Sequence, residues 1–242
     1  MKVSAFICLH HGQDYLEYAI RSVVDIVDEV LVVYSPKPSH GQEGSRPCPE
    51  SRERLYGIAK LAAGGKLRWK EGDFASEGAH RDFGVSQTKG DIVLVLDADE
   101  VWDKTALKEA LEEVQHGEAN HYLVNPVHLW RSFKWICKDA MWPVRFIKKA
   151  GNALVEHRYL KQQYYHFGYA RKPQDVHYKM SIHGHKNELR LGWFTKKFLV
   201  WSPGVGDVHP TCRDVWTPEA FDKSELPELM KEHPYYDMDI IV

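Results

Sequence analysis

One short segment constrains the fold of this chain more than any other. Five consecutive apolar residues, Ile92–Leu96, are followed at once by Asp97, Asp99 and Glu100. An apolar run of this length predicts a strand without a polar face, which needs cover on both sides. Strand-like and helix-like patterns alternate around it over the first 120 residues. This alternation predicts an α/β fold with a mostly parallel, Rossmann-like central sheet flanked by helices.

The same reading places the individual elements. Asp14, Ser51 and Asp103 are predicted to cap the helices that follow them, because their side chains accept hydrogen bonds from free backbone N–H groups. Beyond residue 120, shorter runs rich in aromatic residues predict a smaller mixed or antiparallel C-terminal part. The patterns give strands at 3–9, 29–34, 66–70 and 92–96, and helices at 15–27, 51–63, 78–87 and 105–114.

Charge is distributed unevenly although the formal net charge is only -2. Residues 1–120 carry 14 Lys+Arg against 21 Asp+Glu, residues 121–213 carry 16 against 5, and residues 214–242 carry 2 against 8, giving -7, +11 and -6. The basic middle segment suits a polyanionic partner. For the acidic tail two arrangements stay open: it wraps the body, or it remains mobile.

Composition excludes several classes of protein. Hydrophobic residues at 43% and charged residues at 27% are typical of a folded globular chain. The apolar runs are strand-sized, so no membrane span is expected. The N-terminal sequence enters a strand pattern without a secretory signal, so a cytoplasmic location is the expectation. Four widely separated cysteines form no CxxC pair, so neither a zinc site nor a disulfide framework is expected.

The carboxylates that end the apolar run carry the clearest chemical signal. Ligands of open parallel sheets bind beyond the carboxyl ends of the strands, where Asp97 and Asp99 are predicted to lie. Oxygen ligands of this kind suit Mg2+ or Mn2+, and these ions suit a diphosphate. The structural alternative is an acidic turn that leads into the helix capped by Asp103.

Several segments are similar to one known family. VSAFICLHHGQDYLEYAIRSV, DEVLVVYS and GDFASEGAHRDFGVSQTKGDIVLVLDADE resemble the first strand, turn and helix, the second strand, and the arginine-containing helix with the metal-binding motif of glycosyltransferase family 2, which has the GT-A fold. MWPVRFIKK and YYHFGYARK are weaker matches. The resemblance is closest to the subgroup with a DADE motif that acts on lipopolysaccharide cores or peptides. Leu9-His10 stands where the family usually has Pro-Thr, and Asp82 where it has Asn.

The resemblance implies a metal-dependent inverting glycosyltransferase that moves a sugar from a nucleotide-sugar, expected to be a UDP-sugar, to an acceptor hydroxyl, with Mn2+ or Mg2+ as cofactor. It implies a nucleotide-sugar-binding half at 1–120, a basic, aromatic-rich acceptor-binding half of the same domain at 121–213, and the acidic tail at 214–242.

The candidate site residues come from the matched segments and from neighbouring polar residues. Those expected at the nucleotide-sugar are His10, His11, Tyr34, Arg81, Asp97, Ala98 and Asp99. Those expected at the metal are Asp97, Asp99 and His166, with His183 and His185 as alternatives to the histidine. Asp139 and Glu156 are rival general bases, and Trp142, Arg145 and Arg171 are expected at the acceptor. Arg81 is expected to pair with phosphate or to hold the motif's carboxylates, with a surface ion pair as its structural alternative.

Three questions stay open at this stage. The acceptor is either a hydroxylated base in phage-type DNA, which would be flipped out of a duplex, or a phosphorylated glycan such as a lipopolysaccharide core. A nucleic-acid binding module without catalysis would leave the two aspartates without a purpose. A nucleotidyltransferase is the other alternative, although CLHHGQDY lacks the Gly-rich, basic loop that usually opens such enzymes.

Overall fold

The strands predicted in the first half form a parallel sheet. The computed structural model describes residues 1–38, 48–149, 155–182, 186–212 and 214–239. Four parallel strands lie in the order β3-β2-β1-β4, and Ala5 at the centre pairs with both neighbours. Their bounds are β1 (Val3–Leu9), β2 (Glu29–Tyr34), β3 (Leu67–Glu71) and β4 (Ile92–Leu96). All five residues of β4 are buried, as an apolar run without a polar face requires.

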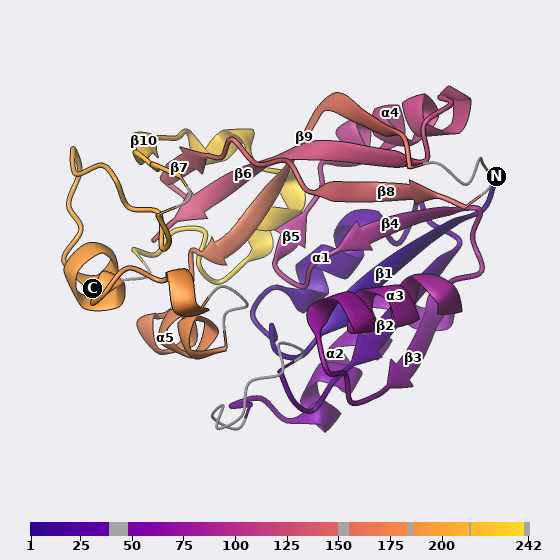
Figure 1. Cartoon of the computed structure of the whole chain (residues 1–242), viewed down its shortest axis with the longest axis horizontal. Coiled ribbons are helices and arrows are strands. Elements are labelled where there is room, and N and C mark those ends of the chain that lie inside the picture. The colour runs from indigo at the N-terminus through magenta and orange to yellow at the C-terminus, as the bar shows by residue number, and fades with distance from the viewer. Residues whose placement is uncertain (39–47, 150–154, 183–185, 213, 240–242) are drawn as a thin grey trace.

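Helices cover both faces of these strands (Figure 1). On one face, apolar residues of α1 (Leu16–Val23), α2 (Arg52–Ala63) and α4 (Lys104–His116) share one core with β1, β2 and β4. On the other face, Phe83 and Val85 of α3 (Glu77–Gln87) pack against the strand residues whose side chains point to that face, such as Phe6. The predicted doubly covered sheet is confirmed.

Two of the three predicted helix caps are present. The Ser51 side chain accepts from the N–H of Arg54, and the Asp103 carboxylate accepts from the N–H groups of Thr105 and Ala106. The prediction for Asp14 is wrong, because α1 begins after Tyr15 without a side-chain cap. The Asp14 carboxylate instead accepts a hydrogen bond of 3.1 Å from the Tyr235 hydroxyl, which belongs to the distant tail.

The second half extends the same sheet to ten strands with mixed directions. β8 joins β4 antiparallel, and β6 carries the sheet on to β7 and β10. The strands are β5 (Glu100–Val101), β6 (His121–Trp130), β7 (Trp135–Lys138), β8 (Val144–Lys148), β9 (His157–Tyr169) and β10 (Glu219–Ala220). The helices are α5 (Pro173–Ser181) and the short η1 (Gly64–Lys66), η2 (Lys186–Glu188), η3 (Phe194–Leu199), η4 (Lys223–Glu225) and η5 (Glu228–Glu232).

The long strand β9 connects this half to the end of β4. It pairs parallel with β6 and antiparallel with β5, where Glu100 faces His166. The N–H of Phe167 donates to the Asp99 carbonyl at 2.8 Å. After β9 the chain turns into α5, which lies beyond the carboxyl ends of the parallel strands (Figure 1). Strand pairing thus brings residues 128, 166 and 179 to the edge where the first half ends.

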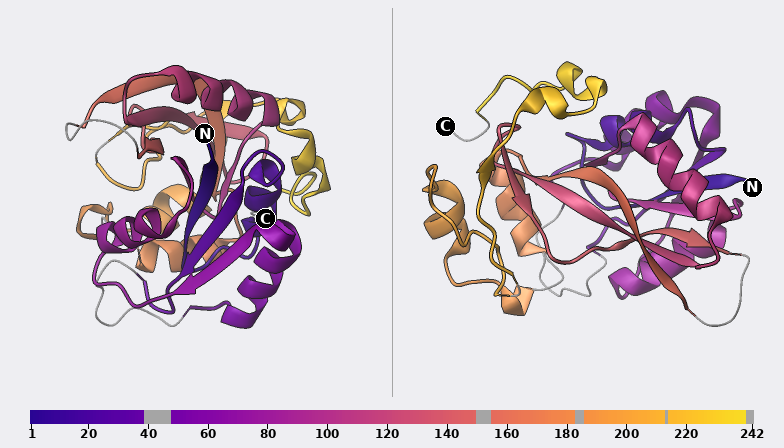
Figure 2. Two further views of the ribbon diagram at one scale, coloured as in Figure 1. Left: turned by 90° about the vertical axis from the view of Figure 1, so that its right-hand side faces the viewer. Right: turned by 90° about the horizontal axis from the view of Figure 1, so that it is seen from above.

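The acidic tail wraps the body, as one of its two predicted arrangements requires. Leu226, Met230 and Tyr235 share a buried cluster with Tyr15 of the α1 region. In the view from above, the tail runs along the side of the molecule opposite α5 (Figure 2). Within the described ranges, no helix has both the length and the apolar character needed to cross a bilayer.

Candidate active site

The turn that follows β4 is packed tightly against the turn that follows β1. Gly12 has φ 146°, and a Cβ atom at this position would lie 2.8 Å from the Cβ of Ala98. The turn is also closed from within, because the N–H of Asp97 donates to the Glu100 carboxylate at 3.0 Å. Glycine at position 12 and alanine at position 98 therefore fix where Asp97 and Asp99 point.

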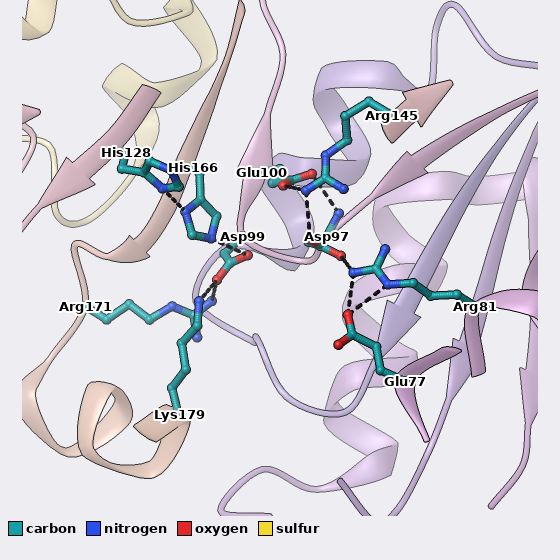
Figure 3. Close-up of polar contacts among 10 residues, drawn as sticks. All are labelled: Glu77, Arg81, Asp97, Asp99, Glu100, His128, Arg145, His166, Arg171 and Lys179. Carbon is teal, nitrogen blue, oxygen red and sulfur yellow. Dashed lines mark hydrogen bonds and ion pairs between the residues drawn. The ribbon is translucent and has the colours of Figure 1, made fainter. Parts of the chain in front are cut away.

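Asp97 is held between two arginines. Its carboxylate lies 3.0 Å from Arg81 of α3 on one side and 3.0 Å from Arg145 of β8 on the other (Figure 3). Burial alone would raise the pKa of Asp97, but Arg81 and then Arg145 outweigh it and lower the pKa to about 2. Of the roles predicted for Arg81, the structure shows the one in which it holds a carboxylate of the motif.

Asp99 is more deeply buried and carries a separate set of contacts. Its Oδ2 lies 3.1 Å from Arg171 and 3.1 Å from Lys179 of α5, and its Oδ1 lies 3.6 Å from Nε2 of His166 (Figure 3). Burial acts to raise the pKa of Asp99, but Lys179, His166 and Arg171 together hold it well below its usual value. Asp99 is thus a buried carboxylate that stays ionised.

Glu100 is 1% exposed and pairs with Arg145. Burial raises the pKa of Glu100 to about 8, although Arg145 acts to lower it. The Arg145 guanidinium also lies 5.1 Å from the ring centroid of Tyr164, and burial of both partners makes it a fixed part of the site. Glu100 therefore holds Arg145 in place against Asp97.

The cluster holds equal numbers of carboxyl and cationic side chains, although the raised pKa of Glu100 leaves that carboxyl largely protonated at pH 7. Its carboxylates are Glu77, Asp97, Asp99 and Glu100, and its cations are Arg81, Arg145, Arg171 and Lys179, four of each. A bound diphosphate would add negative charge that these four cations do not offset in full. A divalent cation is the kind of partner that would offset it.

Two histidines and a further carboxylate extend from Asp99. Nδ1 of His166 lies 2.6 Å from Nδ1 of His128 on the neighbouring strand, and Nε2 of His128 lies 3.3 Å from the Asp139 carboxylate. Burial lowers the pKa of His166 well below its usual value and also lowers that of His128, so both rings are neutral at pH 7. The contacts run without interruption from Asp99 to Asp139.

The residues predicted at the nucleotide lie at the ends of β1 and β2. His10 contacts the Ser35 carbonyl and the Tyr178 hydroxyl at 2.8 Å each. For His11, burial and then the nearby Arg171 and Lys179 lower the pKa to about 3. Tyr34 is buried and stacks on Trp69 with ring centroids 5.7 Å apart.

The two arginines predicted at the acceptor contact the carboxylates of the motif. Arg145 and Arg171 are 5% and 1% exposed and pair with Asp97 and Asp99, respectively. Trp142 is half-buried and packs against the ring of Tyr159 at 5.5 Å.

The rival general bases are separated by the structure. Asp139 lies at the site end of the sheet, where it contacts His128. Glu156 precedes the first residue of β9, whereas His166 lies near its other end. Ten residues of extended chain span roughly 30 Å, so the structure does not bring Glu156 to the cluster. His183 and His185 lie outside the described residues.

The predicted metal site fits an ion with few protein ligands. Within the described residues, no three side chains of His, Cys, Asp or Glu come close enough together to hold a metal ion. Asp99 Oδ1 and His166 Nε2 nevertheless face each other, and a Cβ at Gly168 would lie 2.6 Å from this Nε2. Glycine thus lets the His166 ring lie directly against the backbone. Mg2+ and Mn2+ fit such a pair, because substrate phosphates and water complete their coordination.

Two functional candidates in this cluster, Lys179 and His128, had no sequence signal of their own. Lys179 and His128 lie 80 and 29 residues from Asp99, in segments without a recognisable motif. Glu100 was visible beside the aspartates, but its contact with Arg145 depends on the pairing of β8 with β4. Only the strand order brings these side chains together.

Comparison with known families gives one match. The model of the family described as Glycosyl transferase family 2 matches residues 51–172. This range holds Arg81, Asp97, Asp99, His166 and Arg171. No curated protein matches the chain.

Solved structures similar to this chain include TarS 1-349 from S. aureus in complex with UDP, at 15% identity over 75% of this chain and 64% of that chain, with a TM-score of 0.49. Another is glucosyl-3-phosphoglycerate synthase from Mycobacterium tuberculosis in complex with Mn2+, UDP and phosphoglyceric acid, at 18% identity over 52% and 43% of the two chains, with a TM-score of 0.38. The chain therefore spans less than two thirds of the length of either structure.

Proposed function

The chain belongs to glycosyl transferase family 2, whose model covers residues 51–172, and from this premise we propose that it transfers a sugar from a nucleotide-sugar to an acceptor hydroxyl. The observation that carries the proposal is the cluster of Asp97 and Asp99 with four cationic side chains at the carboxyl end of β4. This is the edge of an open α/β sheet at which ligands bind. The transfer is proposed to invert the configuration at the anomeric carbon of the sugar.

The donor is proposed to be a UDP-sugar, with its diphosphate beside Asp99. Asp99 and His166 would hold Mn2+ or Mg2+, and the ion would offset the charge of the leaving diphosphate. Lys179 and Arg171 lie on the same carboxylate and add positive charge at that point. Asp97, kept ionised by Arg81 and Arg145, is proposed to accept hydrogen bonds from the ribose.

The nucleotide base and ribose are proposed to lie between the ends of β1 and β2, near His10, His11 and Tyr34. His11 stays neutral there, because burial lowers its pKa to about 3. A neutral imidazole both donates and accepts hydrogen bonds, as recognition of a nucleoside requires.

The acceptor is proposed to be polyanionic, because residues 121–213 carry a net charge of +11. Part of this charge is already matched within the protein, since Lys134 and Lys138 pair with Asp239 and Glu219 of the tail. The two candidate acceptors are DNA with a hydroxylated base and a phosphorylated glycan, because each carries both a hydroxyl group and negative charge.

The donor is tested by thermal unfolding with a panel of nucleotide-sugars in the presence of Mn2+ or Mg2+. A specific donor raises the midpoint, by an amount that grows with its concentration over Kd. Asp99→Asn is expected to lose this shift. Asp25→Asn is the matched control, because Asp25 forms an exposed pair with Lys104 away from the cluster. A wild-type chain that no nucleotide-sugar stabilises would contradict the proposal.

The acceptor is tested by binding to single-stranded DNA, duplex DNA, a phosphorylated oligosaccharide and its dephosphorylated form over a range of salt concentrations. A polyanionic acceptor binds less tightly as salt rises, whereas a neutral one changes little. Equal binding of the phosphorylated and dephosphorylated glycans, with no DNA binding at low salt, would count against a polyanionic acceptor.

A further inference from the structure

Asp139 and His128 lie outside the matched motifs, but they form a chain of contacts that leads to His166. Two imidazole nitrogens 2.6 Å apart cannot both carry a proton, and a pair of lone pairs would repel. One ring therefore donates through Nδ1 and the other accepts. If His166 is the donor, its Nδ1 carries the proton and its Nε2 has a lone pair. If His128 is the donor, the proton of His166 is on Nε2.

The neighbouring carboxylates decide between the two arrangements. Nε2 of His128 is buried, and among the described residues it has no hydrogen bond of standard geometry; the Asp139 carboxylate lies 3.3 Å from it. The contact between His166 Nε2 and Asp99 Oδ1 is longer, at 3.6 Å. The shorter contact favours a proton on Nε2 of His128. Nδ1 of a neutral His128 then accepts, and His166 donates through its Nδ1.

We propose that Asp139 and His128 are positioning residues that hold His166 in the tautomer whose free Nε2 lone pair faces Asp99. The proposal deepens the proposed function and rests on it, since this lone pair is the one a divalent cation would need. A metal-bound imidazole commonly donates its other N–H to a group that fixes its orientation. Here His128 is that group, and Asp139 fixes His128 in turn.

In this tautomer the Nε2 lone pair of His166 faces Asp99 Oδ1, which is also an acceptor. Two acceptors that face each other repel unless a cation lies between them. Ligand atoms in adjacent positions around Mn2+ or Mg2+ are about 3 Å apart. The distance of 3.6 Å between His166 Nε2 and Asp99 Oδ1 would therefore have to shorten by only a few tenths of an ångström. Gly168 lets the His166 ring and Lys179 lie directly against the backbone, since a Cβ there would lie 2.6 Å from this Nε2 and 2.4 Å from Nζ of Lys179.

The Asp139 carboxylate is already engaged on two sides in this arrangement. It accepts from the N–H of Met141 at 2.8 Å and faces His128. Burial acts to raise the pKa of Asp139, but His128 and the Met141 N–H outweigh it and leave the pKa lowered. Two imidazole rings separate it from Asp99. A general-base role for Asp139 is a different role, and the two roles predict different behaviour in an Asp139→Asn variant.

The test uses the full chain labelled with 15N at histidine. In the wild type, NMR should show His166 protonated at Nδ1. Asp139→Asn replaces an obligate acceptor by an amide that also donates, so His128 can adopt the other tautomer and the proton on His166 moves toward Nε2. Binding of Mn2+ alone, measured by calorimetry, should weaken 10- to 100-fold.

Two further variants guard against a folding effect. His128→Phe keeps a ring against Trp216 but removes the acceptor, and it should weaken Mn2+ binding in the same way. His121→Phe changes a histidine at the other end of β6 and should leave the His166 tautomer and Mn2+ binding unchanged. Circular dichroism melts identify any variant that has lost its fold.

The outcomes separate the competing roles. An unchanged His166 tautomer and unchanged Mn2+ binding in folded Asp139→Asn would overturn the proposal, and a loss of turnover in that case would assign Asp139 as the general base. A wild-type chain that binds no Mn2+ would refute the metal role in the proposed function. The tautomer shift in Asp139→Asn would still establish the positioning role.

Discussion

Replacing Gly12 by alanine tests whether the turn after β1 fixes the position of the two aspartates. The added methyl group would lie 2.8 Å from the Cβ of Ala98, whereas ordinary contacts begin at 3.4 Å. One of the turns must therefore move by about 0.6 Å, or both must share the shift. The backbone adds a second cost, because φ at this residue is 146°, a value that residues with a side chain rarely adopt.

The expected magnitude is the sum of two effects. Overpacking costs about 1–3 kcal/mol, and backbone strain adds about 1–3 kcal/mol. We expect Gly12→Ala to lower the free energy of unfolding by about 2–6 kcal/mol in urea titrations. Turnover should fall as well, because displacements approaching 1 Å in a reacting site can cost about 100-fold.

A double-mutant cycle isolates the contact itself. Ala98→Gly removes the partner methyl group, so Gly12→Ala/Ala98→Gly should recover the overpacking part and leave the backbone strain. The coupling energy should be about 1–3 kcal/mol in favour of the double variant. A coupling within about 0.5 kcal/mol of zero, or a Gly12→Ala variant as stable as the wild type, would refute the packing argument.

Further predictions concern the charges and the rival bases. Asp97, with its pKa lowered to about 2, contributes stability that is present above its unfolded pKa near 4 and is lost as pH falls toward 2. The free energy of unfolding from urea titrations should therefore fall by about 2 kcal/mol more in the wild type than in Asp97→Asn between pH 5 and pH 2. Parallel pH dependence of the two proteins would contradict this. Arg145→Met leaves Glu100 buried without its partner and should cost about 3–5 kcal/mol in urea unfolding, so a cost below about 1 kcal/mol would show that the pair is not needed. Glu156→Gln should change turnover by less than about twofold, because extended β9 separates this residue from the cluster; a loss of 100-fold would instead assign Glu156 a role in catalysis.

Much of the parallel half was predictable because its signals are local. The apolar run of β4 determined a buried strand, and its carboxyl end then placed Asp97 and Asp99 at the ligand-binding edge. Ser51 and Asp103 capped the predicted helices because the cap and its N–H partners are neighbours in sequence. Arg81 is one helix away from Asp97, close enough for their pairing to be among the predicted alternatives.

Predictions failed where long-range pairing decides the outcome. Asp14 was read as a helix cap, but its carboxylate binds Tyr235, which is 221 residues away. For Arg145 and Arg171, which were expected at the acceptor, the sequence did not show that both are buried against carboxylates of the motif. Glu156 was predicted as a rival of Asp139 for the general base, but the direction of β9 carries it away from the cluster.

The sequence by itself determined the alternating elements, the covered parallel sheet and the pair of aspartates at its edge, since periodicity, capping and apolar runs act over a few neighbouring residues. Only the tertiary structure decided the partners of those aspartates. Lys179, His128 and Asp139 reach the site through strand order and register, which depend on contacts between segments far apart in the chain.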